Sequence, residues 1–346
     1  MPFIHWLCLG LVFSTAVDDA TASVACASVD RQRSTANIRL DNDLLGGRHQ
    51  DRGYTNGILL AFTGHPFDEP GDMCPSWDSR ATMWLVKWMF GGKKGQGSTA
   101  VSVEHAIFTP TQASRSDLIA DDRPYAGVLL VSRSYSMREA NLQRGVRLTI
   151  GVVGPAARGK QVQGMAHEIT GGQRFLGWDH QLKDEPIFNV GYEHRHRSPT
   201  RQLMGGLESQ MISRWEGQVG NLLTAAEVGG ELRLGFRLPN DFGTTSFRSV
   251  GEGLVWSEGD AWRQWSGHLF LGANGRLVAR DVTLDGNTFA NSHSVSKRPL
   301  VGVISYGVDV AKGRWRIVLS RTHATRDFDT QANAPVYGSV AVTYVL

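Results

Sequence analysis

Three short segments carry side chains that could hold a metal ion or activate water. Asn42 and Asp43 end one predicted strand, Thr55 lies at the start of the next, and His167 lies on a predicted loop helix. Carboxylate, hydroxyl and amide oxygens suit a hard cation such as Ca²⁺, and a neutral histidine beside them suits a general base that deprotonates water. The cation would polarise an ester carbonyl and stabilise its oxyanion. These residue types therefore fit a hydrolase that needs no catalytic serine.

Each of these residues also has an ordinary structural explanation. An aspartate at the end of a strand often forms a turn, Asn56-Gly57 is a common turn dipeptide, and a single histidine on a loop helix more often faces solvent. The chain has no Gly-x-Ser-x-Gly, His-Glu-x-x-His, phosphate-loop or Cys-x-x-Cys motif. The chemistry therefore depends on whether the fold brings the three segments together.

The elements that must position these segments are strands. Apolar and polar residues alternate strictly along residues 146–152, 232–238 and 304–310, and a period of two over six or more residues indicates a half-buried strand. Strands of this kind are predicted over residues 35–43, 54–64, 99–108, 124–136, 145–154, 187–197, 201–213, 222–238, 262–276, 299–311, 314–323 and 334–346.

The alternation alone does not separate a soluble β-sandwich from a membrane barrel, whose apolar residues face lipid and whose polar residues face the lumen. The even number of strands and their length favour the barrel, because a tilted spanning strand needs about 9–11 residues. We therefore predict an all-β fold, a transmembrane antiparallel β-barrel of about twelve strands. Counting strands outward from the N-terminus places loops 44–53, 109–123, 155–186, 280–298 and 324–333 on the outer side.

One outer loop departs from the strand pattern. Val162, Met165, Ala166 and Ile169 follow a helical spacing of i, i+3, i+4 and i+7, which predicts a short amphipathic helix with this stripe as its apolar face. The helix carries His167 to the same rim as the two strand ends.

Composition and the N-terminus define the broad class. The formal net charge of +3 is too small to indicate a nucleic-acid partner. An apolar run over residues 3–17, followed by small residues, predicts a signal peptide over residues 1–25 and a single barrel domain over residues 26–346. No later stretch has the 18 or more apolar residues of a spanning helix. Whether Cys26 and Cys74 pair stays open.

Seven segments, in this order, resemble the lipid A 3'-O-deacylase (LpxR) family of outer-membrane barrels. They cover residues 41–43, 51–57, 122–127, 153–155, 161–167, 177–181 and 284–289. The resemblance implies a twelve-stranded barrel in the outer membrane of a Gram-negative bacterium, with its active site facing outward. It also implies Ca²⁺-dependent removal of the 3'-linked acyloxyacyl group of lipid A, so the partners would be lipopolysaccharide and outer-membrane lipid, with no protein partner evident.

The resemblance also implies roles for individual residues. Asn42 and Asp43 match an Asn-Asp pair of the family site, Thr55 matches a threonine beside the cation, and His167 matches the general base. The chain has Gln173 where a member of the family has a glutamate six residues after the histidine. An amide oxygen can still bind Ca²⁺ but brings no charge. The implied metal ligands are therefore Asp43, Thr55 and Gln173.

Two more residues have implied roles at this site. Arg115, in the loop after Thr109-Pro110, lies where a basic side chain could bind a phosphate of lipid A. Glu168 is the alternative source of the charge that Gln173 does not supply.

Three other functions remain open from the sequence. The first is a different outer-membrane phospholipase or esterase on the same barrel. The second is a catalytically inactive barrel that acts as a channel or adhesin. The third is a soluble β-sandwich or lipocalin-like binding protein, which would bury its apolar face in a core instead of exposing it to lipid.

Overall fold

The computed structural model describes residues 34–43, 53–64, 66, 95–170, 174–244 and 262–346. Its strands belong to one antiparallel sheet. The long strands are β1 (Thr35–Asn42), β2 (Gly53–Thr63), β3 (Gln96–Thr109), β4 (Ala126–Arg138), β5 (Leu142–Val153), β6 (Glu185–Arg197), β8 (Glu208–Gly220), β9 (Leu223–Phe236), β10 (Trp262–Asp281), β11 (Leu300–Gly313), β12 (Trp315–Ala324) and β13 (Val336–Val345).

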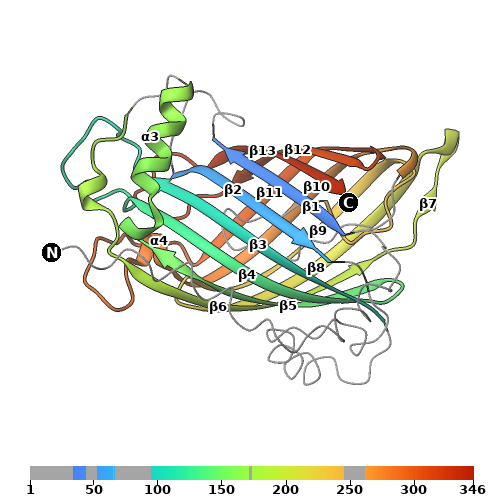
Figure 1. The fold of residues 1–346 in the computed structure, drawn as a ribbon, viewed down its shortest axis with the longest axis horizontal. Coiled ribbons are helices and arrows are strands. Elements are labelled where there is room, and N and C mark those ends of the chain that lie inside the picture. The colour runs from blue at the N-terminus through green and yellow to red at the C-terminus, as the bar shows by residue number, and fades with distance from the viewer. Residues whose placement is uncertain (1–33, 44–52, 65, 67–94, 171–173, 245–261) are drawn as a thin grey trace, which may run out of the picture.

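These strands close into a barrel (Figure 1). Each pairs with its neighbour in the chain, the first strand pairs with the last over Thr35–Asn42, and β6 pairs with β8. The two-residue strand β7 (Arg201–Gln202) pairs only with the start of β8 and is not part of the closed wall. The prediction of twelve antiparallel strands is confirmed.

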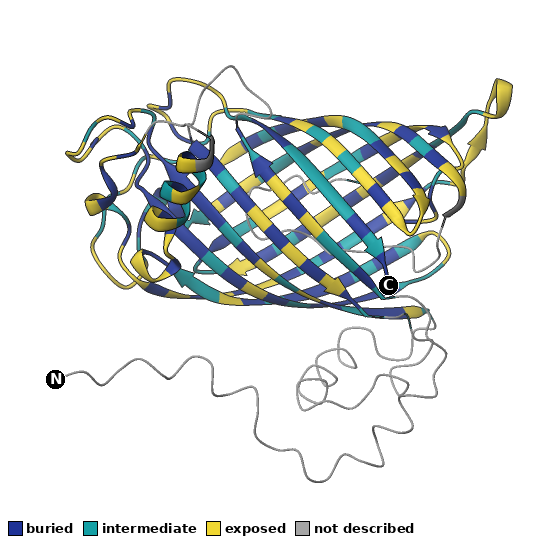
Figure 2. Cartoon of the chain, turned by 45° about the horizontal axis from the view of Figure 1, so that its top comes forward, coloured by how far each residue is buried: buried dark blue, intermediate teal, exposed yellow. Residues whose placement is uncertain are grey.

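The burial pattern shows which face of the strands points outward. Along β1, Ile38 and Leu40 are 41% and 44% exposed, whereas Arg39 and Asp41 between them are 8% and 3% exposed. The same alternation continues around the wall (Figure 2). Apolar outside and charged inside is the polarity of a barrel in lipid, so the soluble sandwich and lipocalin interpretations are wrong. No helix in the described part of the chain is both long and apolar enough to cross a bilayer.

The seventh predicted strand is misplaced. Residues 201–213 were expected to form one strand, but β7 turns back through Met204–Gly206 and the wall strand runs over Glu208–Gly220. Gly205 and Gly206 have φ of 70° and 76°, a left-handed conformation that glycine adopts without a Cβ clash. This glycine pair builds a hairpin that extends beyond the barrel, and the strand of the wall starts after it (Figure 1).

The two ends of the barrel differ. One carries the helices α3 (Gly159–Thr170) and α4 (Val282–Asp285), and we call it the α3 end; the other carries β7, and we call it the β7 end (Figure 1). Most connections described at the α3 end are long, although β8 and β9 are joined there by the two residues 221–222, whereas β4 and β5, or β11 and β12, are joined at the β7 end by tight turns.

The long loops at the α3 end fold onto one another. Arg123, buried at the barrel mouth, donates to the Thr283 hydroxyl at 2.8 Å and lies 4.5 Å from the ring centroid of Phe108. The Nε2 of His293, in the loop before β11, lies 2.7 Å from the Asp122 carbonyl oxygen in the loop before β4. These contacts fix the loop that leads into β4, against which α3 packs.

Candidate functional site

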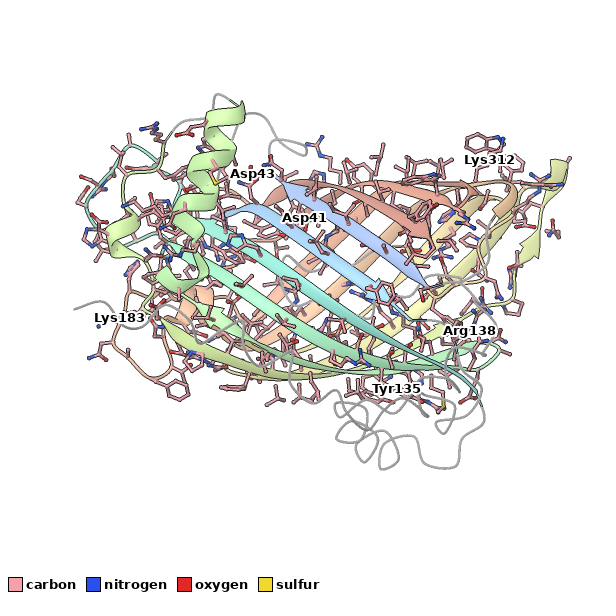
Figure 3. The ribbon with its side chains drawn as sticks, in the orientation of Figure 1. Asp41, Asp43, Tyr135, Arg138, Lys183 and Lys312 are labelled. Carbon is pink, nitrogen blue, oxygen red and sulfur yellow. The ribbon has the colours of Figure 1, made fainter. Side chains whose placement is uncertain are left out.

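Asn42, Asp43 and Thr55 lie together at the rim of the α3 end. Asn42 pairs in register with Asn56 across β1 and β2, and its side-chain amide donates to the Asn56 side-chain oxygen. The Asp43 backbone N–H points to the Thr55 carbonyl oxygen at 3.5 Å, and both of these side chains are buried. Figure 3 shows Asp43 just beyond β1, on the side of the barrel where α3 stands. The predicted proximity of the two strand ends is confirmed.

An irregularity in β2 sets the orientation of Thr55. The register between β2 and β3 shifts between Tyr54 and Asn56, so Thr55 is the extra residue of a bulge. Its hydroxyl oxygen lies 2.7 Å from that of Thr109. Bulges re-aim side chains and occur often beside active sites. Here the bulge places a buried hydroxyl at the rim beside Asp43.

Asp41, two residues before Asp43, faces the lumen instead. The Tyr54 hydroxyl donates to its carboxylate at 2.8 Å, and an Arg39 guanidinium nitrogen lies 2.9 Å away. The two aspartates of this segment therefore have different partners and different surroundings. Asp41 is held by a buried lumenal network, and Asp43 is the rim carboxylate.

The helix α3 docks on the barrel through a close backbone approach. A Cβ on Gly159 would lie 2.9 Å from the Gly127 Cα and 2.7 Å from the Trp178 ring. The Trp178 indole N–H donates to the Gln163 side-chain oxygen at 2.9 Å, and both side chains are fully buried. Glycine at both backbone positions lets the start of the helix contact β4 directly, and Trp178 holds it there.

The face of α3 that packs inward carries polar residues beside Val162, which packs against the neighbouring aromatic cluster, so the predicted apolar stripe is only partly correct. The helix itself is confirmed, but Met165 of the predicted apolar stripe is 64% exposed. Gln163 and His167, one turn apart, are 2% and 6% exposed. A helix presents i and i+4 on one face, and the hydrogen bond from Trp178 stabilises a polar group on that inward face.

His167 is held beside an aromatic cluster. Its ring centroid lies 5.7 Å from that of Phe175, which packs with Tyr125, Trp178, Ile107 and Ala113. The cluster joins the loop before β4, the end of β3 and the segment after α3. Its burial and its contact with Phe175 hold the imidazole at the α3 end.

Sequence reasoning did not assign roles to Gln163 and Trp178. Gln163 lies four residues before His167, and this helical spacing was the available signal for a shared inward face. Trp178 lies within a segment of the family resemblance but was not given a function. Its contact with Gln163 joins segments that the sequence alone does not pair.

Arg115 forms an exposed ion pair on the loop between β3 and β4. Its Nε donates to an Asp117 carboxylate oxygen at 3.0 Å, and a second guanidinium nitrogen contacts the other oxygen. The hydrogen bond from Arg115 lowers the pKa of Asp117 to about 2, so the pair is ionised at neutral pH. Arg115 is at the α3 end, and a ligand phosphate would compete with Asp117 for it.

Several sequence predictions concern residues outside the described part of the chain. They are Gln173, the signal peptide over residues 1–25, and the cysteines Cys26 and Cys74. Glu168, the alternative to Gln173, is an exposed residue of α3 whose carboxylate lies 3.4 Å from Arg174. It points to solvent while its neighbour His167 is buried.

The rim donors can be tested for their fit to a cation. Among the described residues, no three His, Cys, Asp or Glu side chains cluster as a metal site. What the rim offers is one carboxylate from Asp43, the Thr55 hydroxyl and the Asn42 side-chain amide, all with hard oxygens. Such donors suit Ca²⁺ and not a transition metal, which prefers imidazole or thiolate. The residues present therefore fit the cation that the resemblance implies.

The fold and its polarity define the class: a closed antiparallel barrel with an apolar exterior and a charged lumen is an outer-membrane β-barrel. A family model described as "Outer membrane protein LpxR" matches residues 7–346. The chain belongs to the LpxR family and is an outer-membrane protein, as its residues predicted.

Solved structures with similar folds include LpxR from Salmonella typhimurium, which is 19% identical with a TM-score of 0.69 over 90% of this chain and 100% of that one. The β domain of the Bordetella autotransporter BrkA is 10% identical, with a TM-score of 0.42 over 90% and 98% of the two chains. The first likeness supports the fold. No curated protein matches the chain.

Proposed function

We propose that this protein is a Ca²⁺-dependent outer-membrane hydrolase that removes the 3'-linked acyloxyacyl group from lipid A. Membership of the LpxR family supports the reaction class. The observation that carries the proposal is the burial of His167 on a helix docked beside the rim that holds Asn42, Asp43 and Thr55. This arrangement joins a general base and hard oxygen donors at one end of a lipid-embedded scaffold.

In the proposed mechanism, His167 accepts a proton from a water molecule as the water oxygen attacks the ester carbonyl carbon. Asp43, Thr55 and Asn42 would hold the cation, and Gln173 would support the site. The cation, when bound, supplies Lewis acidity to the ester carbonyl. The protonated imidazole then donates its proton to the 3' oxygen as the bond between the acyl carbon and this oxygen breaks. The products are a free fatty acid with its secondary acyl chain and a 3'-hydroxyl on lipid A.

The loops at the α3 end offer both surfaces that such a substrate needs. Met165 on α3 and Leu176 just after it are exposed apolar side chains that acyl chains can contact. Arg115 supplies a guanidinium for a phosphate on the sugar. Under this proposal the α3 end faces outward, where lipid A forms the outer leaflet.

The test is to express the chain in a Gram-negative host and record lipid A mass spectra with Ca²⁺ or a chelator. We expect lipid A to lose the mass of the acyloxyacyl group in the presence of Ca²⁺ and to keep it with the chelator. The rate of this loss should fall at least a hundredfold in His167→Ala, since general-base catalysis contributes about 10²–10⁴-fold. His323→Ala is the matched control, because His323 stacks on Tyr306 outside this site and the variant should keep full activity.

Unchanged lipid A from protein that is folded in the outer membrane would contradict the proposal. Gln173→Glu is then the variant to try, because it restores the charge that the resemblance implies for the cation site. The same lipid extract tests the phospholipase alternative. Loss of acyl chains from phospholipid with lipid A intact would replace the deacylase with that enzyme.

A further inference from the structure

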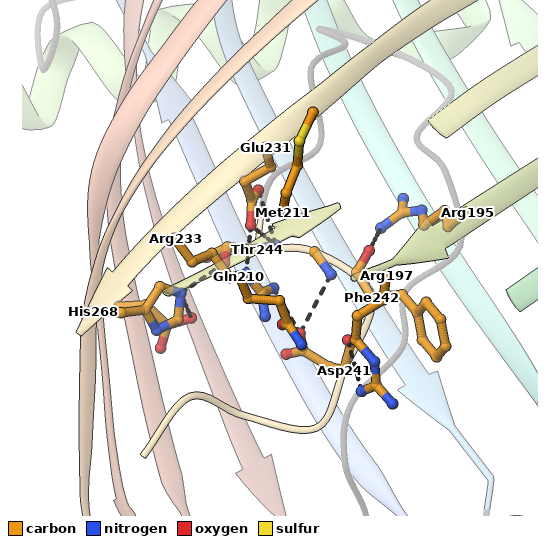
Figure 4. Close-up of polar contacts among 12 residues, drawn as sticks. Arg195, Arg197, Gln210, Met211, Glu231, Arg233, Asp241, Phe242, Thr244 and His268 are labelled. Carbon is orange, nitrogen blue, oxygen red and sulfur yellow. Dashed lines mark hydrogen bonds and ion pairs between the residues drawn. The ribbon is translucent and has the colours of Figure 1, made fainter. Parts of the chain in front are cut away.

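The chain after β9 turns back into the barrel at the β7 end. Residues 238–244, which we call the inner segment, follow Arg237, whose φ of 52° starts the turn. Asp241 and Phe242 at its centre are 0% and 1% exposed. Figure 4 shows them among arginines of the barrel wall. A surface loop would not bury a carboxylate and a phenyl ring, so the segment has a specific seat.

The Asp241 carboxylate links two strands of the barrel wall, β9 and β12. One oxygen lies 2.6 Å from an Arg233 nitrogen, and the other lies 2.7 Å from an Arg316 nitrogen. Arg233 is on β9 and Arg316 is on β12, and both are buried on the lumenal face. Burial raises the pKa of Asp241, but the two guanidinium groups outweigh it and hold that pKa below the ordinary value.

Two arginines of β6 bind the backbone of the inner segment. Arg195 donates to the Phe242 carbonyl oxygen at 2.9 Å, and Arg197 donates to the Asp241 carbonyl oxygen at 3.2 Å. Charge-assisted hydrogen bonds are stronger than neutral ones. Successive carbonyls are therefore fixed by successive lumenal residues of one strand.

The Phe242 ring and Thr244 complete the seat. The guanidinium carbons of Arg197 and Arg138 lie 4.7 Å and 5.6 Å from the Phe242 ring centroid, within the range of cation–π contacts. The Thr244 backbone N–H donates to Glu231 at 3.0 Å, and its hydroxyl lies 3.0 Å from His268 Nε2. The centre of the segment and its C-terminal end are thus held.

The contacts of the inner segment reach around the barrel. They come from β4, β6, β9, β10 and β12, and β4 is separated from β12 by β3, β2, β1 and β13 in the sheet order. We propose that the inner segment is a built-in plug that closes the lumen at the β7 end to solutes. The plug is remote from α3, and the barrel is then a sealed scaffold and not a channel.

A thiol placed in the lumen tests the plug. Ser134→Cys on β4, in a background with the native cysteines changed to serine, puts a probe on the buried lumenal face. A charged, membrane-impermeant methanethiosulfonate reagent is added to the purified, folded barrel in detergent. We expect slow labelling in the parent and labelling at least tenfold faster when Asp241→Ala and Phe242→Ala are added.

The matched control is the pair Asp117→Ala and Phe289→Ala, which removes the same residue types from exposed positions at the α3 end and should leave the labelling rate unchanged. Equal rates in the parent and the plug variant, with both barrels showing heat-modifiable mobility on gels, would overturn the proposal. If the double variant does not fold, Phe242→Ala alone decides: it keeps the ion pairs of Asp241 and should label at least threefold faster, and an unchanged rate would refute the plug.

Discussion

The two ends of this barrel are held by different interactions. At the α3 end, the site is assembled by ring packing around Trp178 and by the close approach of Gly127 and Gly159. At the β7 end, Asp241 lies between Arg233 and Arg316 in a buried network of charges. Figure 3 places Asp43 and Lys183 at the first end and Arg138 and Lys312 at the second.

The difference separates two tasks within one sheet. Buried ion pairs are directional and are costly to break, because removing one partner leaves the other charge without compensation. Packing of a loop helix through rings and glycines is local, so its loss need not unfold the wall. We therefore expect the β7 end to set the stability of the barrel and the α3 end to set the rate of its chemistry.

Asp241→Ala should have the largest effect, a loss in the free energy of unfolding of the barrel. Removing one partner of a buried pair typically costs about 3–5 kcal/mol, and we expect about 3 kcal/mol because Arg233 keeps Glu231 and Arg316 keeps Asp309. The contribution is present above the ordinary aspartate pKa and is lost as the pH falls through the lower pKa of the folded state.

Urea unfolding of the protein refolded in lipid vesicles measures this change. The lipid A deacylation rate of the folded fraction should stay within twofold of the parent, because the plug is at the opposite end. A variant as stable as the parent, or one that folds but has lost most of its deacylase activity, would show that the two ends are not independent.

Trp178→Ala should have the opposite effects: it should reduce activity and leave the stability of the barrel nearly unchanged. Truncating a buried tryptophan costs about 3–5 kcal/mol in a core, and here the loss falls on the contact of Trp178 with Gln163 and Gly159. We expect deacylation to fall at least tenfold and hydrogen exchange in α3 to rise, with little change in urea unfolding of the barrel. Trp215→Ala, on the outer face of β8, is the control. Full activity in Trp178→Ala would show that Trp178 does not position α3 for catalysis.

The strands could be predicted because lipid outside and charge inside impose alternation on the sequence. Eleven of the twelve predicted strands overlap the wall strands closely, since each has its own polarity signal. The seventh was misplaced because alternation does not reveal that Gly205 and Gly206 turn the chain back. Because successive strands run in opposite directions, the strand count also predicted that Asn42, Asp43 and Thr55 lie at the same end of the barrel as the loop that carries His167.

What the sequence did not predict consists of contacts between distant segments. The inward face of α3 was predicted from apolar spacing, but beside Val162 it also carries Gln163, which accepts the Trp178 N–H, and the buried His167. The seat of Asp241 needs Arg197 of β6, Arg233 of β9 and Arg316 of β12, which lie 44, 8 and 75 positions from it in the sequence. No local pattern encodes their meeting.

Gly127→Ala is a milder test of the α3 end. The new Cβ would lie 2.8 Å from the Gly159 backbone nitrogen and 2.9 Å from its Cα, and overpacking of this kind costs about 1–3 kcal/mol. The start of α3 should shift outward and deacylation should fall about threefold to tenfold. Gly217→Ala is the matched control, because nothing lies within 4 Å of its added Cβ. Equal activity of the two variants would show that this close approach does not position His167.

The smallest expected effect tests whether charge also matters at the α3 end. Burial raises the pKa of Asp327, which Arg123 opposes and Asp281 reinforces. An acid whose pKa is raised on folding binds its proton more tightly in the folded state, so stability falls as the pH rises from the ordinary aspartate value through the raised one. At neutral pH the ionised carboxylate is then destabilising, and Asp327→Asn should stabilise the barrel by a few tenths of a kcal/mol, discounted because the residue is half-buried.

Urea midpoints of the parent and Asp327→Asn between about pH 4 and pH 8 measure this difference. The variant should have the flatter profile and the higher midpoint at neutral pH, while Asp329→Asn, which removes an exposed partner of Arg298, should leave the profile of the parent unchanged. A lower midpoint for Asp327→Asn would mean that attraction to Arg123 outweighs burial. The α3 end would then depend on a buried ion pair, as the β7 end does, and the contrast between the two ends would be one of degree.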